Sequence, residues 1–370
     1  MPLFSEHLGP TITPCEPAWA GGRTTFIPKF PKCGGDAVKE ILDFIITFSA
    51  VLWEAMPFIV LGAVIAGILE EFLPQQAITR FLPKQVIPAV IIGSLLGLIF
   101  PMCECGILVV MRRLLRKGLP LSCCVAYMLA GPIINVVVIF STAVAFVPHR
   151  IGAEVVGMRV GLGFLVAVVT GLVVQRQWVR HGNNLLTTIA IPPELKEHSK
   201  PGLSLPLIDG VIQHHGHEHH IPRKTFFKRM GNISSTALHD FVDITVFLIL
   251  GAVMAALAKQ YIGSAEIEQL SSGQPLLAIP VMMLMAVLMC LCSEADAFVA
   301  ASFTQMHISG KIAFLVLGPM LDLKLLMMYT RVFKPRLIAI ITTSVVIQVF
   351  VYSLIVWLVY RVNGWSGLPG

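Results

Sequence analysis

The stretch Pro101-Met102-Cys103-Glu104-Cys105-Gly106 places two thiols and a carboxyl inside an apolar run. From Val86 to Met111, Glu104 is the only formally charged residue. A run of this length is a candidate membrane span, and a carboxyl at membrane depth is costly unless it has a partner. The proline before the cysteines and the glycine after them predict a break in the helix. We therefore expect a transport site at an interrupted helix.

The composition of the whole chain is that of a polytopic membrane protein. Its 370 residues are 56% hydrophobic and 13% charged, whereas an average soluble domain has about 25% charged residues. At about 20 residues per span, the apolar runs predict roughly eight transmembrane helices. The basic residues lie in short clusters between these runs, which is typical of cytoplasmic loops and does not suggest nucleic acid. The sequence therefore predicts an all-α integral membrane protein.

Composition divides the chain into four segments. They are an N-terminal cytoplasmic tail (1–40), a first four-helix repeat (41–175), a cytoplasmic His-rich loop (176–236) and a second four-helix repeat (237–362). The basic run Arg112–Gly118 and the 176–236 loop are assigned to the cytoplasm. With eight spans, both termini are then cytoplasmic. The basic loop Arg331–Arg336 falls outside, against the positive-inside rule.

The two halves share polar landmarks at nearly one sequence offset. The offset is 187 for Gly131 and Gly318, Asn135 and Asp322, Cys103 and Cys290, and Cys105 and Cys292; it is 189 for Glu54 and Asp243, and for Gly62 and Gly251. Four spans per half predict repeats of the same orientation, related by an axis along the membrane normal. Transporters built from repeats often bind their substrate at midplane, where interrupted helices meet.

Thiols and carboxyls inside the spans are candidate ligands for a thiophilic cation such as Zn(II) or Cu(I). Cysteines two positions apart lie about 200° apart around a helix, so Cys103 and Cys105 can converge only at a break. The predicted site comprises Cys103, Glu104, Cys105, Cys290, Cys292, Glu294 and Asp296. The groups assigned to proton coupling or to the pathway are Glu54, Asp243, Asn135 and Asp322.

Two of these groups follow a Gly-Pro break, so helix capping is an equal alternative for Asn135 and Asp322. Lys324 is expected to pair with Asp322 or with Asp296. Cys123 and Cys124 are expected to be buried small hydrophobes.

Five histidines in seven residues form a second metal-binding candidate in the central loop. They are His214, His215, His217, His219 and His220. Imidazole binds Zn, Cu and Ni, and such tracts are a compositional sign of metal binding. The tract lies outside the spans, so it would capture or sense metal. A solvated loop without a function is the alternative.

Four functions are compatible with these residues. The first is proton-coupled export of Zn(II) or Cu(I), and the second is export of arsenite or an organoarsenical through three thiols. The third is a membrane thiol oxidoreductase, and the fourth is a metal sensor without flux. The motif Gly-x-x-x-x-Gly-Lys-Ser/Thr is absent, so an ATP-driven pump would need a separate subunit. We expect no catalytic residues, no tightly bound cofactor and no nucleic-acid partner. The expected partners are a metal-ion substrate and the lipid bilayer, and a homo-oligomer is left open.

Three stretches resemble the predicted permease family that includes the ArsP-type organoarsenical exporters. They are Pro101–Gly106, Arg112–Pro120 and Ala130–Asn135, and Cys292–Ala300 is similar to the matching second-half motif. The resemblance covers about residues 40–360. It implies an eight-span efflux permease of the bacterial inner (plasma) membrane.

The chain departs from the usual pattern of this family. Relatives often carry Ser where Glu104 stands, and a Pro where Val109 and Val110 stand. The His-rich loop is also not general. Together with Glu104, the loop resembles the branch described as copper/zinc efflux transporters, which favours a metal cation over an organoarsenical.

Overall fold

The computed structural model describes residues 35–72, 85–99, 102–149, 151–187, parts of 235–257, 275–303 and 306–364. In the first half the helices are α1 (Gly35–Phe72), α3 (Val86–Ile99), α4 (Glu104–Arg116), α5 (Leu121–Ala130), α6 (Val136–Ala145) and α7 (Gly152–His181). In the second half they are α11 (Pro275–Met289), α12 (Asp296–Ser302), α13 (Ile308–Leu317), α14 (Leu323–Tyr329) and α15 (Pro335–Val362), preceded by helical residues within 235–257. Short 3₁₀ turns follow α6 (Val147–His149) and α7 (Gly182–Leu185).

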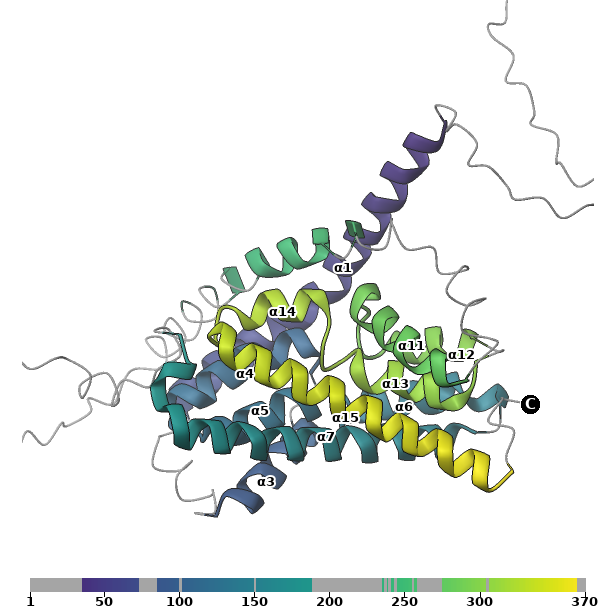
Figure 1. Ribbon diagram of the computed structural model, residues 1–370. Coiled ribbons are helices and arrows are strands. Elements are labelled where there is room, and N and C mark those ends of the chain that lie inside the picture. The colour runs from purple at the N-terminus through teal and green to yellow at the C-terminus, as the bar shows by residue number, and fades with distance from the viewer. Residues whose placement is uncertain are drawn as a thin grey trace, which may run out of the picture.

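This arrangement confirms the predicted all-α membrane class (Figure 1). Among the described helices, α1, α7 and α15 are long and apolar enough to cross a membrane. Large apolar side chains such as Trp53 on α1, Phe140 on α6 and Ile347 on α15 are exposed, as expected of a lipid-facing surface. The number of spans stays a prediction.

Helices α3 and α4 run in opposite directions, so the predicted second span is wrong. A Cβ atom on Gly93 of α3 would lie 2.6 Å from the carbonyl of Cys123 near the start of α5, and one on Gly97 would lie 2.6 Å from Gly131 just after α5. α3 is therefore parallel to α5. α4 is antiparallel to α5, because Ile107 near the start of α4 touches Gly131 and a short turn joins the end of α4 to the start of α5.

Helices α11 and α12 form the same arrangement in the second half. A Cβ on Gly310 would meet Ala278 near the start of α11, and one on Gly318 would meet Ala286 near its end. α11 is therefore parallel to α13. Asp296, the first residue of α12, lies beside Gly318, so α12 runs back along α13. We call α3–α4 and α11–α12 the two hairpins.

The arms of these hairpins are shorter than a membrane. α3 has 14 residues and rises about 21 Å at about 1.5 Å per residue, whereas the hydrocarbon core is about 30 Å thick. This length fits a re-entrant hairpin. Hydropathy could not predict the reversal, because a helix that continues after a break and one that turns back are equally apolar.

The break after α5 is of a different kind, because α6 continues in the direction of α5. α7 runs back along both helices: Cβ atoms on its glycines 152, 163 and 171 would meet the carbonyl of Ala143, the side chain of Ile133 and the side chain of Ala126 in turn. α5 and α6 therefore form one interrupted span. α13 and α14 occupy the matching place in the second half. α5 and α13 both have ten residues, and they begin 187 residues apart, as do α6 and α14. The internal repeat stays a prediction, which these equal boundaries support.

Helices α7 and α15 pack side by side in opposite directions. Tyr360 near the end of α15 donates a hydrogen bond to Glu154 near the start of α7, and Gln348 donates to Thr170 at 2.9 Å in the middle of both helices. Each of these helices follows the interrupted span of its half, so they are equivalents in the predicted repeat. Antiparallel equivalents contradict the predicted common orientation and fit repeats that are inverted in the membrane. The predicted common orientation assumed four crossings per half, which counts each hairpin as a crossing.

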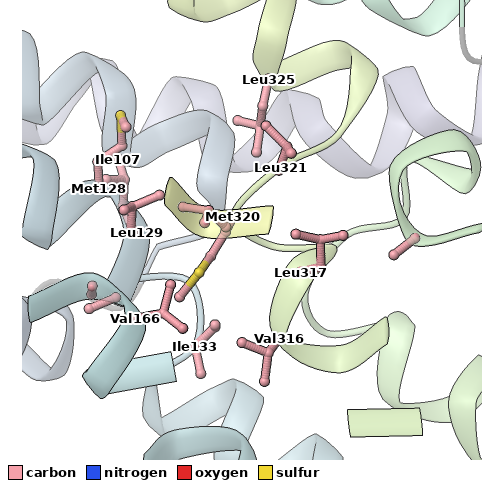
Figure 2. Packing of buried hydrophobic residues seen from close by; sticks show 14 of the residues in the cluster. Ile107, Met128, Leu129, Ile133, Val166, Val316, Leu317, Met320, Leu321 and Leu325 are labelled. Carbon is pink, nitrogen blue, oxygen red and sulfur yellow. The ribbon is translucent and has the colours of Figure 1, made fainter. Parts of the chain in front are cut away.

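The two halves share one apolar core. Met320, in the break between α13 and α14, is fully buried. Figure 2 shows its side chain reaching from Leu317 and Leu321 of the second half toward Ile133 and Val166 of the first. This packing holds the two interrupted spans together, close to the tips of the hairpins.

Candidate metal-binding site

The tips of the two hairpins meet at one buried cluster. Cys103 is the N-cap residue of α4 and has an extended backbone (φ −70°, ψ 170°), and Cys292 lies in the turn between α11 and α12. One ligand atom each from Cys103, Glu104 and Cys292 lie within 4.8 Å of one another, and all three residues are buried. Within the described ranges, this is the only group of three such residues with that spacing. The structure thus brings predicted residues from both halves together.

Cys105 adds another thiol on the first hairpin. The Cys103 thiol contacts the thiols of both Cys105 and Cys292. Cys103 precedes the helix and Cys105 lies in its first turn, so the break removes the separation of about 200° that a continuous helix would impose. The sequence predicted this requirement, and the backbone at Cys103 meets it.

Of the other second-hairpin residues, Glu294 lies beside the cluster, and Cys290 is not part of the three-residue group. The Cys292 thiol donates to Glu294 Oε2 at 2.9 Å. Cys290 follows the last residue of α11 and has a left-handed backbone (φ 50°), a conformation that is uncommon for a residue with a Cβ atom. Its thiol donates to the carbonyl of Val287 in α11 at 3.4 Å. The structure therefore does not place the Cys290 thiol among the candidate ligands.

Asp296 belongs to a separate ion pair and is not among the three clustered residues, so its predicted role as a ligand stays a prediction. Both of its carboxylate oxygens accept hydrogen bonds from Arg159 Nη2 at 2.8 Å. Arg159 also donates to Thr142 Oγ1 at 2.7 Å and to the Ser293 carbonyl at 3.0 Å. This buried network joins α7 to the tip of the second hairpin. Sequence reasoning missed Arg159, although a cation within an apolar span is the same signal that singled out the carboxyls.

Lys324 is an ion-pair partner of Glu104. Its Nζ atom is 2.7 Å from Glu104 Oε1 and 3.6 Å from Asp322 Oδ2, and it donates to the Cys290 carbonyl at 3.4 Å. The expected pairing with Asp322 is present and the alternative pairing with Asp296 is not. The shortest contact, with Glu104, joins the two halves and was not predicted.

Asn135 and Asp322 cap helices. The backbone N–H of Val137 donates to Asn135 Oδ1 at 3.0 Å, and that of Leu325 donates to Asp322 Oδ1 at 2.6 Å. Each bond satisfies a backbone donor that a helix start leaves unpaired. Asp322 retains a second oxygen that faces Lys324, whereas no contact links Asn135 to the cluster within the described residues.

Several predicted residues, or their side chains, lie outside the described part of the structure. Glu54 belongs to α1, but its side chain lies outside the described part of the structure. Asp243 and the five histidines between 214 and 220 lie outside the described residues. Their roles stay predictions.

Residues 40–358 match the family described as "Predicted permease". The chain belongs to this family. The permease is 36% identical over 321 residues to "UPF0718 protein YcgR" of Bacillus subtilis, which covers 86% of this chain and 99% of that protein. It is 31% identical over 319 residues to the "Putative two-component membrane permease complex subunit" of Streptococcus mutans, covering 86% and 96% of the two chains. No solved structure matches the permease significantly.

The buried cluster gives the permease a specific chemistry. Thiols are soft donors and suit thiophilic ions, and a carboxylate supplies charge and an oxygen ligand. The irregular backbone at the hairpin tips is buried in protein, which is where a membrane protein tolerates it. The family resemblance found from the sequence is confirmed, whereas the copper/zinc branch stays a prediction.

Proposed function

We propose that this permease exports a thiophilic metal ion, Zn(II) or Cu(I), through a site formed by Cys103, Glu104 and Cys292. The observation that carries this proposal is the convergence of three buried ligand atoms within 4.8 Å. Tetrahedral zinc has Zn–S bonds of about 2.3 Å and Zn–O bonds of about 2.0–2.2 Å, so its ligand atoms lie about 3.5–3.8 Å apart. Small side-chain movements would close the cluster around one ion.

The position of the cluster supports transport. The first hairpin opens toward the end of α7, because Gly171 of α7 lies beside Ser122 at the start of α5. The second opens toward the start of α7, because His307 before α13 stacks edge-on against Tyr360, which contacts Glu154. The tips therefore approach from opposite sides. A site between them could be exposed to one side at a time, as alternating access requires.

We infer that the basic ends of the helices face the cytoplasm. Lys334 N donates to the Leu185 carbonyl at 3.0 Å, and Thr187 N donates to the Val332 carbonyl at 3.1 Å. The Arg331–Arg336 loop therefore lies beside the start of the 176–236 loop. Their predicted placement on opposite sides is wrong, and with this correction all the basic clusters obey the positive-inside rule.

This orientation moves both termini to the outer side of the membrane. The crossings would be α1, α5–α6, α7, a span that includes the apolar helix Thr245–Met254, α13–α14 and α15. Their number is even, so the ends of the chain lie on one side. α15 begins next to the cytoplasmic loops and ends beside Glu154, on the opposite side. This proposal replaces the expectation of cytoplasmic termini and retains the bacterial inner membrane.

A trivalent arsenical is the second candidate substrate. The observation that favours it is the contact of the Cys103 thiol with two further thiols, those of Cys105 and Cys292. Three soft donors would suffice for this metalloid, and Glu104 would not be a ligand. The two candidates therefore differ in their need for the carboxylate.

Transport by the purified protein in proteoliposomes tests the proposal. We expect wild-type protein to move Zn(II) or Cu(I) and Cys103→Ser to lose this movement. Cys123→Ser is the matched control, because Cys123 is a buried free thiol in α5 outside the cluster. Equal transport by wild type and Cys103→Ser would refute the thiol site. A redox-cycling disulfide found by thiol trapping would favour the oxidoreductase alternative.

The state of assembly needs a separate experiment in the native membrane. The Streptococcus mutans relative is named as a subunit of a two-component complex. We therefore extend the expectation of a homo-oligomer to a second membrane subunit. Cross-linking in the native membrane, followed by mass measurement of the product, distinguishes the two assemblies.

A further inference from the structure

We propose that Lys324 is a built-in counter-ion, which takes the place of the metal ion at Glu104 when the site is empty and thereby permits the empty transporter to change conformation. This inference rests on the proposed function, because it assigns a role within the transport cycle of the same site. Lys324 is not one of the proposed ligands, which are Cys103, Glu104 and Cys292.

The geometry places the ammonium group where it competes with a metal ion. Lys324 Nζ lies 2.7 Å from Glu104 Oε1, and both side chains are almost completely buried. Glu104 also supplies one of the three clustered ligand atoms. A metal ion bound to this carboxylate and the ammonium group would be two cations only a few ångströms apart, in surroundings that screen charge poorly. Binding of the metal ion should therefore displace Lys324 from Glu104.

A second resting place for the ammonium group already exists. Asp322 Oδ2 lies 3.6 Å from Lys324 Nζ, and the Cys290 carbonyl accepts from it at 3.4 Å. Asp322 and Lys324 sit together at the start of α14, and Cys290 is in the tip of the second hairpin. A small side-chain movement would transfer the ammonium group from a first-half carboxylate to these second-half acceptors.

The charge balance explains why such a residue is useful. Glu104 and Asp322 are the carboxylates in ion-pair range of Lys324, whereas Asp296 is paired with Arg159. Without Lys324, an empty site would hold Glu104 as an unpaired buried charge. That state is strongly unfavourable at membrane depth. Either the metal ion or Lys324 removes this cost, so the protein could change conformation both loaded and empty.

Two flux assays in proteoliposomes containing the full-length protein separate this role from a structural one. Net efflux is measured from Zn-loaded vesicles into metal-free buffer, which requires the empty protein to return. Exchange is measured with radioactive zinc and equal Zn(II) concentrations on both sides. It does not require the empty protein to return. For Lys324→Gln we expect net efflux to fall at least about tenfold relative to exchange, because removing one partner of a buried pair is costly. Its zinc affinity should rise.

Two further variants serve as controls for this test. Lys311→Gln removes another buried ammonium group, which lies over the Phe146 ring at 5.8 Å and makes no described contact with the cluster; it should leave the ratio of net efflux to exchange unchanged. Lys324→Gln combined with Asp322→Asn removes one charge of each sign and keeps a helix-capping side chain. It should show the same separation of the two fluxes, even if the single variant does not fold.

The possible outcomes are distinct. Loss of net efflux with retained exchange supports the counter-ion role. Equal changes in both fluxes, or no change in either, overturn it. Wild-type vesicles that move neither zinc, copper nor arsenite would instead refute the proposed function itself.

Discussion

Both carboxylate oxygens of Asp296 accept hydrogen bonds from Arg159 Nη2 at 2.8 Å, across the boundary between the two halves. The same guanidinium group donates to the Ser293 carbonyl in the tip of the second hairpin. Arg159 therefore fixes this tip against α7, a helix that supports the first half. A carboxyl that the sequence assigned to metal binding thus also positions the hairpin that carries Cys292.

Removing only one partner of this pair should destabilise the protein strongly. We expect Arg159→Leu to cost about 3–5 kcal/mol, because it leaves the Asp296 charge buried and unpaired. The double variant Arg159→Leu with Asp296→Leu should recover most of this loss. Thermal unfolding in detergent measures both effects. Arg176→Leu, at an exposed position of α7, is the control, and an Arg159→Leu protein as stable as this control would contradict the prediction.

The contact between α3 and α5 should not tolerate a methyl group. A Cβ on Gly97 would lie 2.6 Å from the Gly131 Cα atom, so Gly97→Ala must push two backbones apart. We expect a loss of at least about 1–3 kcal/mol from this overpacking, measured by thermal unfolding. Gly157→Ala is the matched control, since its Cβ would meet nothing within 4 Å and alanine favours a helix by about 0.5–1 kcal/mol over glycine. Equal effects of the two substitutions would argue against the parallel packing of α3 and α5.

Glu104→Gln should distinguish a metal cation from an arsenical. Zinc affinity should fall by at least the roughly 10–100-fold that the loss of an outer partner causes at metal sites, because a direct ligand and its charge are removed. Binding of a trivalent arsenical through three thiols should be preserved. Equilibrium binding of Zn(II) and of arsenite to the purified variant provides the comparison. Unchanged zinc affinity would exclude the carboxylate from the site.

Side-specific labelling should place the end of α15 and the turn between α6 and α7 on the side opposite to the basic loops. The six described cysteines are buried, so only Cys15 and Cys33, outside the described residues, are first replaced by serine. In this background, single reporters at Lys334→Cys and Pro120→Cys should react with an impermeant maleimide only from the cytoplasmic side. Val147→Cys and Asn363→Cys should react only from the outside. All four positions are exposed. The same accessibility for Lys334→Cys and Asn363→Cys would show that α15 does not cross the membrane.

The sequence was sufficient for the fold class and for locating the helix breaks. Hydropathy is a local property, so the apolar runs predict membrane helices without knowledge of their packing. Proline and glycine act on the backbone at their own positions, and the first-half stretch from Pro101 to Gly106 does contain the start of a new helix. Residues at such breaks were selected for the site, and Cys103, Glu104 and Cys292 do converge.

The direction of the chain after each break was decided only by the tertiary structure. An α3 that continued into α4 would show the same composition as one that reverses, so the sequence could not distinguish a span from a hairpin. The predicted orientation of the repeats and the predicted side of the Arg331–Arg336 loop both depended on whether each of these segments is a span or a hairpin. The charge partners followed from it: Arg159 with Asp296 and Lys324 with Glu104 are contacts between halves, and long-range pairing depends on how the helices pack rather than on any local pattern.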